Sequence, residues 1–377
     1  MTFTRYELTI PVTLTSELHI GGVDEVPDRD GEGTVIRFNR NGLKEPTIPG
    51  RSIRGAVRAA CNALREERKS EDDPLAADDG IFSDSNWESL WGDDLAHHEG
   101  DSPDDVLPVR RSALTFHAVS FPEYKDSDSG ESPLQRRHGV GIDRTTGAAS
   151  DGALYEHEFL PRGTKFDIRI TAEGRDGEKM GRDQSDGIPE PASSESVKKL
   201  LEVIVDVLTS GAVCLGGRTG SGQGTIQVIE PKLRSTGKTT DAGALTAPSD
   251  VLDALIGEDE EGTPIPLELG GWSPQEPARI RITWWSPTGI FVAEDEKLTK
   301  QRKAQKEAEN RKKGIDEEVH EVVYPLRDPS VAWDEAQLLI PGTSIRGALR
   351  SRASRIARTV LASRDDFERL ASHDIHE

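Results

Sequence analysis

The sequence has few of the residues that mark a disulfide-bonded or membrane-spanning protein. Its 377 residues include only two cysteines, Cys61 and Cys214, which excludes a disulfide framework and a zinc site with four cysteine ligands. Hydrophobic residues make up 34% of the chain, which is low but sufficient for a core in each of two domains. No stretch approaches the roughly 18 apolar residues of a membrane span, and the N-terminus does not read as a signal peptide. We therefore expect a cytoplasmic protein, no membrane contact, and structural cysteines.

Positive charge is also scarce. The chain has 47 Lys and Arg against 68 Asp and Glu, a formal net charge of −21 at pH 7. Such a charge ordinarily argues against a polyanionic partner, because phosphate contacts supply most of the affinity for nucleic acids. The acidic residues, however, gather in segments such as 70–79, 101–105 and 258–261, whereas arginine lies beside glycines and at predicted helix starts. RNA binding through close contacts with these arginines is therefore compatible with the negative net charge.

An internal repeat is the most informative feature that is present. The segment TIPGRSIRGAVR at 47–58 returns as LIPGTSIRGALR at 339–350, with nine of twelve positions identical and no gap. Apolar residues then follow at helical spacing in both copies, so each motif is predicted to open an amphipathic helix. The predicted buried positions are Ile53, Val57, Ala60, Cys61 and Leu64 in the first copy, and Ile345, Leu349, Ala353, Ile356 and Val360 in the second.

The elements around the first copy predict an α+β domain over residues 1–232. An alternating strand at Tyr6–Ile20 precedes the motif, and a second helix is expected at about Ser194–Thr209. Further strands are expected at Val109–Ser120, Thr164–Thr171 and Thr225–Ile229. The order strand, helix, strands, helix, strand is that of a ferredoxin-like or RRM-like fold.

The remaining chain predicts a linker and an incomplete second copy of this fold. Residues 233–276 are rich in Gly, Pro, Thr and acidic residues, which is typical of a flexible acidic linker. From residue 277 to 377 only a strand at Ala278–Phe291 and the repeated helix are recognisable. The run Glu296–Lys313 carries charge of both signs and is typical of a solvated helix or loop.

Two segments predict contacts with phosphate. The first turn of a helix binds anions, and in the first copy three arginines at spacings of three and four flank it, with Ser52 as the expected cap. The segment LGGRTGSGQG at 215–224 has five glycines that let backbone N–H groups approach a phosphate chain. No Gly-Lys-Ser/Thr ends it and no helix follows, so no nucleotide cofactor is expected, and nothing indicates haem. The candidate residues are Gly50, Arg51, Ser52, Arg54 and Arg58; Ser344, Arg346 and Arg350; and Gly216, Gly217, Arg218, Gly220, Gly222 and Gly224.

Five motifs in this order resemble the RAMP superfamily of CRISPR-associated proteins. They are LHIGG at 18–22, IPGRSIRGAVR at 48–58, GIDRTTGAA at 141–149, FLPRGTKF at 159–166, and the glycine-rich segment. The chain looks most like the backbone subunits of type III effector complexes, which serve antiviral defence. The resemblance implies an RRM-like palm that binds the CRISPR guide RNA (crRNA), alongside other effector subunits. It also implies an inserted thumb-like hairpin around Asp143, Arg144 and Ala149 that intrudes between guide and complementary target RNA. His19 and His138 lie beside these motifs and are further candidates for RNA contact.

In that family an aspartate after the first strand supports metal-dependent cleavage of target RNA. The matching position here is Glu32, with Asp28 and Asp30 close by, and these carboxylates are the candidates for binding Mg²⁺ or another divalent metal. In the second copy Asp328 is a weaker candidate. Two alternatives stay open: a structural subunit without catalysis, and an endoribonuclease that processes guide RNA through histidine without metal.

Overall fold

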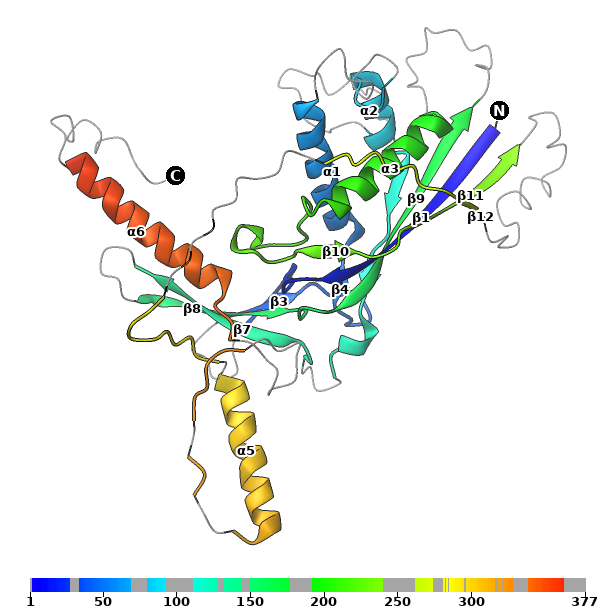
Figure 1. Cartoon of the computed structure of the whole chain (residues 1–377). Coiled ribbons are helices and arrows are strands. Elements are labelled where there is room, and N and C mark those ends of the chain that lie inside the picture. Colours follow the sequence, from blue (N-terminus) through cyan, green and yellow to red (C-terminus); the bar gives the residue numbers. More distant parts are fainter. Residues whose placement is uncertain are drawn as a thin grey trace, which may run out of the picture.

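The computed structural model describes residues 2–362 except 28–33, 69–79, 93–110, 128–131, 144–148, 177–191, 240–261, 274–280, 282, 284, 295, 316–317, 321 and 328–337. These residues form a helix-covered sheet, a second sheet beside it, and two long helices that project from the body (Figure 1). Within the described residues, no helix is both long and apolar enough to cross a membrane.

The main sheet is antiparallel and is built around β1 (Thr2–Leu14). Its order is β12 (Thr263–Ile265), β11 (Lys232–Thr239), β1, β9 (Lys165–Asp176) and β5 (Leu114–Phe116), and β10 (Ile226–Val228) pairs with the end of β1. Every second residue of β1 and β9 is buried, as expected for strands with one covered face. The fold is therefore α+β with an RRM-like arrangement of strands, as the sequence predicts.

Two helices cover one face of this sheet. Helix α1 (Gly50–Glu67) buries all five residues predicted for its apolar side, and α3 (Ser194–Thr209) has the predicted bounds. Ser193 caps α3 by accepting a hydrogen bond from the backbone N–H of Ser196, and Gly211 follows in a left-handed conformation. A third helix, α2 (Asp84–Trp91), was not predicted; its Trp87 and Trp91 join the same core.

A second sheet lies beside the first and contains the predicted hairpin. Its order is β2 (Gly21–Pro27), β3 (Thr34–Phe38), β8 (Ala149–Phe159) and β7 (Gln135–Ile142). Strands β7 and β8 pair antiparallel up to Ile142 and Ala149, at the position expected for the thumb-like hairpin. The short strands β4 (Thr47–Ile48) and β6 (Val119–Ser120) pair with each other, and the 3₁₀ turn η1 (Pro122–Tyr124) follows.

Parts of the expected linker belong to the folded body. Residues 232–239 form β11, which pairs with β1 along eight positions, because β1 is long enough to hold partners on both edges. Further on, Glu202 of α3 accepts a hydrogen bond from the backbone N–H of Glu268 at 3.1 Å. Asp206 accepts one from Gly270 at 2.9 Å and one from Trp272 at 3.2 Å. Residues 267–272 therefore cross α3 and cover it.

The second copy differs from its prediction. The described residues between Ala278 and Phe291 form no strand, since no neighbouring strand pairs with them there, and Trp285 is 81% exposed. Helix α6 (Gly342–Ala362) forms as predicted, but the burial prediction for its apolar side was wrong: Ile345, Leu349, Ile356 and Val360 are about half exposed. Within the part of the chain that the structure describes, no sheet or second helix covers them as β5 and α3 cover α1. Helix α5 (Glu296–Lys313) lies between these segments along the chain.

Candidate RNA-binding site

The glycine-rich loop is fixed against the segment that follows β1. The backbone N–H of Gly217 donates to the carbonyl of His19 at 2.9 Å, and that of Gly224 donates to Glu17 at 2.8 Å. Gly216 has φ +76°, and a Cβ there would lie 2.3 Å from the His19 oxygen. Gly224, at φ +78°, would bring a Cβ to within 1.9 Å of the Leu215 oxygen. Glycine is therefore required at both positions for the loop to adopt this path.

The same loop contacts the hairpin. Arg218 comes directly before the 3₁₀ turn η3 (Thr219–Ser221) and has a left-handed conformation with φ 60°. Its guanidinium donates a hydrogen bond to the Tyr155 hydroxyl at 3.0 Å. Its guanidinium also lies 4.8 Å from the centre of the Tyr155 ring. Gly139 on β7 makes room for this ring, since a Cβ there would be 2.3 Å from it. The loop and the hairpin thus present an arginine–aromatic pair of the kind that stacks on RNA bases.

Two histidines lie behind this contact. The His19 Nδ1–H donates to the Glu158 carbonyl at 2.6 Å, and the His19 ring meets the His157 ring edge-on at 5.3 Å. Burial, followed by the charge of Arg218, lowers the pKa of His157 to about 3; burial also lowers the pKa of His19. Both ring nitrogens of His157 lack a hydrogen-bond partner among the described residues. Both imidazoles are therefore neutral near pH 7 and support the loop from beneath.

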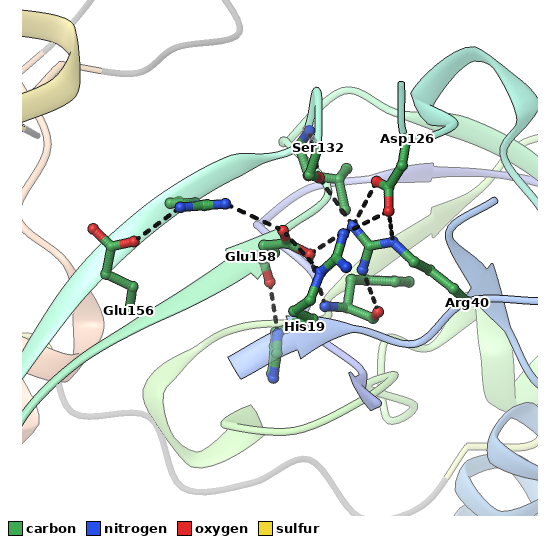
Figure 2. Close-up of polar contacts among 10 residues, drawn as sticks. His19, Arg40, Asp126, Ser132, Glu156 and Glu158 are labelled. Atoms are coloured by element: carbon green, nitrogen blue, oxygen red, sulfur yellow. Dashed lines mark hydrogen bonds and ion pairs between the residues drawn. The ribbon is translucent and has the colours of Figure 1, made fainter. Parts of the chain in front are cut away.

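The opposite face of the hairpin holds a buried ion cluster, shown in Figure 2. Glu158 is fully buried and accepts hydrogen bonds from Arg40, at 2.8 Å, and from the Phe38 backbone, at 3.0 Å. Asp126 pairs with the same arginine at 2.7 Å and with Arg37 at 2.5 Å. Because buried charges of this kind are tolerated only when paired, the cluster fixes the hairpin base in one orientation. Its role is to position the loop–hairpin contact.

The first Pro-Gly motif forms the helix start that the sequence predicts, with one correction. The N-cap of α1 is Pro49, with no side-chain cap, and Ser52 lies inside the first turn instead of capping it. Gly50 is needed because a Cβ would lie 2.0 Å from the Phe116 carbonyl oxygen. Arg54 donates to the Trp91 carbonyl and lies 5.7 Å from its ring, because the unpredicted α2 packs beside it. Arg51, by contrast, is exposed.

The second Pro-Gly motif lies at the glycine-rich loop of the first module. A Cβ at Gly342 would lie 2.0 Å from the Ser221 carbonyl oxygen, so the start of α6 touches the loop backbone. A Cβ at Gly220 would stand 3.0 Å from a guanidinium nitrogen of Arg346. Two segments about 120 residues apart along the chain, each predicted to bind phosphate, therefore lie side by side.

Some of the predicted residues are brought together and others are outside the described part of the chain. His19, Gly216, Gly217, Arg218, Gly220 and Arg346 form one continuous region, and Asp143 directly follows β7 at the far end of the hairpin. Asp28, Asp30, Glu32, Asp328 and Arg144 lie outside the described residues, as does the side chain of His138. The described residues contain no group of three or more His, Cys, Asp or Glu that could hold a metal.

The prediction missed Tyr155 and His157, although the sequence carries a signal for them. Tyr155, His157 and Phe159 alternate with glutamates just before the FLPRG motif, which is the period of a strand. A hollow of about 680 Å³ on the helix-free face of the main sheet contains none of the predicted residues. It is lined by charges of both signs, including Arg5, Glu7, Asp167 and Arg169. The candidate site is therefore the exposed loop and hairpin, not this hollow.

A family model supports the assignment. Residues 12–227 match the model of the RAMP superfamily, a range that holds β5 and β9 of the main sheet, both covering helices, the hairpin and the glycine-rich loop. The chain belongs to the RAMP superfamily. Comparison with curated proteins gives no match. As a RAMP protein, the chain is CRISPR-associated and binds RNA, and the loop–hairpin region is the candidate site for that binding.

Proposed function

We propose that this RAMP protein is a guide-RNA-binding backbone subunit of a type III CRISPR interference complex. The contact between the glycine-rich loop and the start of α6 is the observation that supports this most strongly. Subunits that follow an RNA strand need phosphate-binding elements of consecutive modules next to each other. Here a loop from the first module and a helix start from the second are adjacent on one chain. Such contacts hold the RNA backbone and are independent of guide sequence.

The hairpin supports a role in guide–target pairing. Strands β7 and β8 extend from the loop contact towards Asp143, so the hairpin projects beyond the arginine–aromatic pair. In this proposal Arg218 and Tyr155 contact the guide, and the hairpin tip separates guide from target at intervals. The complementary target RNA and the other effector subunits are the remaining partners.

We further propose that residues after β2 cleave the target with a divalent metal. Pro27 of β2 and Thr34 of β3 are paired, and Asp28, Asp30 and Glu32 come between them in the sequence. Carboxylate oxygens are the donors that Mg²⁺ prefers. A bound divalent ion would polarise the scissile phosphate and favour attack by the ribose 2′-hydroxyl.

Histidine-based processing of guide RNA is less well supported. A general base must reach the proton it removes, and both His19 and His157 are buried. The Nδ1–H of His19 is already donated to the Glu158 carbonyl. A structural subunit without catalysis remains the main alternative to cleavage.

The proposal is tested by co-expressing the chain with its neighbouring genes and a CRISPR array. Labelled complementary RNA is then added to the purified complex with and without Mg²⁺. The triple variant D28A/D30A/E32A should bind target without cutting it. A matched control, D101A/D104A/D105A, removes the same charge from another acidic segment and should cut like the wild type.

Each outcome decides between the alternatives. Metal-dependent cleavage at regular intervals that is lost in D28A/D30A/E32A but kept in the control variant supports the metal-dependent nuclease. Guide RNA bound without any cleavage supports the structural subunit. Cleavage without metal supports the processing enzyme, and a complex that carries no guide RNA contradicts the proposal.

A further inference from the structure

Helix α5 is a strongly basic segment of an acidic chain. Its 18 residues include eight Lys and Arg and three Glu, a net charge of +5, so the rest of the chain carries −26. Six of the 15 lysines in the whole protein fall within this helix. Solubility does not account for this concentration, because the excess of acidic residues already keeps the protein away from zero net charge.

Most of this charge is exposed and is not neutralised nearby. Lys306, Arg311, Lys312 and Lys313 are exposed, and no salt bridge within the described part of the chain involves them or Lys303. Arg302 has a buried acidic partner, Glu294, with which it pairs at 2.7 Å. The helix therefore presents a surface of uncompensated positive charge.

Solvation of an ordinary helix explains only part of the pattern. Cations in the last turn are favoured by the helix dipole, which accounts for Arg311, Lys312 and Lys313. Lys303 and Lys306, however, are three residues apart, and like charges at that spacing repel each other. The helix has few apolar residues whose burial would offset the repulsion. An anion bound along the helix would reduce the repulsion between these lysines.

The helix is held at its base and projects from the body. The carboxylate of Glu294 accepts hydrogen bonds from Thr299, at 3.2 Å, and from Arg302, while its backbone N–H donates to Tyr324 at 3.0 Å. From this base α5 extends away from both sheets (Figure 1). Between Lys300 and Lys313 it offers about 20 Å of basic surface at 1.5 Å per residue.

The internal repeat gives α5 a position relative to the RNA. In the second module, α5 precedes the Pro-Gly motif along the chain. In the first module, the corresponding position before the motif is occupied by β2, β3 and the proposed catalytic carboxylates. Residues 21–38 hold five acidic and two basic residues, a net charge of −3, whereas α5 carries +5. Corresponding insertions in the two modules therefore have opposite charge.

We propose that α5 binds the sugar–phosphate backbone of an RNA strand passing the two modules. The inference rests on the proposed RNA-binding function and adds a contact surface outside the loop–hairpin region. In this arrangement the insertion of the first module would cleave the target RNA, and α5 of the second module would bind the RNA backbone. Because phosphate contacts release counterions, binding by α5 should depend strongly on salt.

The test uses the full chain and poly(U), an RNA without secondary structure. The variant K303Q/K306Q/R311Q/K312Q/K313Q removes five charges while glutamine keeps a high helix propensity. If three or four phosphate contacts are lost, the slope of log affinity against log salt should become shallower by about 2 to 3. Affinity at low salt should fall on the order of tenfold to hundredfold.

A second variant in the same helix gives a control of opposite sign. E307Q/E309Q makes α5 more basic and should bind poly(U) more tightly than the wild type. Weaker binding by both variants would mean that the substitutions disturb the helix, and an unchanged salt slope in the first would mean that α5 does not touch RNA; either result overturns the inference. Light scattering on the same samples identifies the competing case, in which α5 binds an acidic face of a second copy. That result, a change of oligomeric state with unchanged RNA binding, also overturns it. If the wild type binds no poly(U), the proposed function itself fails.

Discussion

The repeated motif allows the same substitution to be made in two different environments. Ile53 and Ile345 occupy the same position of the shared sequence SIRGA, and both lie in the first turns of a helix. Ile53 is 0% exposed and packs in the main core, whereas Ile345 is 48% exposed. Any difference between the two alanine variants therefore reports on burial and not on helix formation.

The expected magnitudes are well separated. Truncating a buried Ile to Ala costs about 2–5 kcal/mol, and the higher helix propensity of Ala returns only a few tenths. Ile53→Ala should therefore lower the free energy of unfolding by about 2–4 kcal/mol. Ile345→Ala removes a side chain that is half in water and should change stability by less than about 0.5 kcal/mol.

Urea unfolding followed by tryptophan fluorescence measures both. Trp87 and Trp91 lie in the same core as Ile53 and report its unfolding. Equal destabilisation by the two variants would refute the reasoning, because it would mean that α6 is covered within the chain. If Ile345→Ala lowers the free energy of unfolding only when a partner protein is present, α6 lies in an interface with that partner.

Three other predictions test the residues that support the candidate site. Glu158→Gln should lower the unfolding free energy by about 3 kcal/mol in thermal scans, since it removes one of the two carboxylates, Glu158 and Asp126, that pair with the buried Arg40. Gly216→Ala should reduce affinity for poly(U), because it clashes with the His19 carbonyl, whereas Gly217→Ala meets nothing closer than 3.9 Å and should bind normally. For His157 the folded pKa lies at about 3, so only the unfolded chain takes up its proton as the pH falls below about 6.5. As the pH falls, this difference lowers the free energy of unfolding by up to about 1.4 kcal/mol per pH unit. The unfolding free energy of His157→Phe, measured with urea, should therefore depend less on pH between pH 7 and 5 than that of the wild type.

Elements whose sequence period matches their environment were predictable. The apolar residues of α1 and the bounds of α3 follow directly from helical spacing, since both helices lie on a sheet with one side buried. Gly216 and Gly224 were predicted to let backbone N–H groups approach phosphate, which stays a prediction; the structure shows that both have positive φ angles and lie against carbonyl oxygens of the chain itself. In these cases local pattern and tertiary packing require the same residues.

The failures occur where a distant segment decides the outcome. The stripe on α6 has the same period as that on α1, but periodicity cannot tell whether another element covers it. Strand β11 has a polar, Gly- and Thr-containing sequence typical of a linker, yet β1 offers it a free edge. Arg54 resembles a solvated phosphate ligand until α2 places Trp91 beside it.

The distribution of charge reconciles RNA binding with a net charge of −21. The loop–hairpin region adds Arg218 and Arg346 to exposed backbone, and α5 adds +5 on a projecting helix. The glycine-rich loop and α6 contain no acidic residue, and α5 has eight Lys and Arg against three Glu, while charge elsewhere is screened within about 10 Å at 0.1 M salt. A polyanion near these surfaces therefore responds to local positive charge and not to the total. Affinity should accordingly be lost on neutralising α5 or the loop, whereas removing distant acidic residues should change it little.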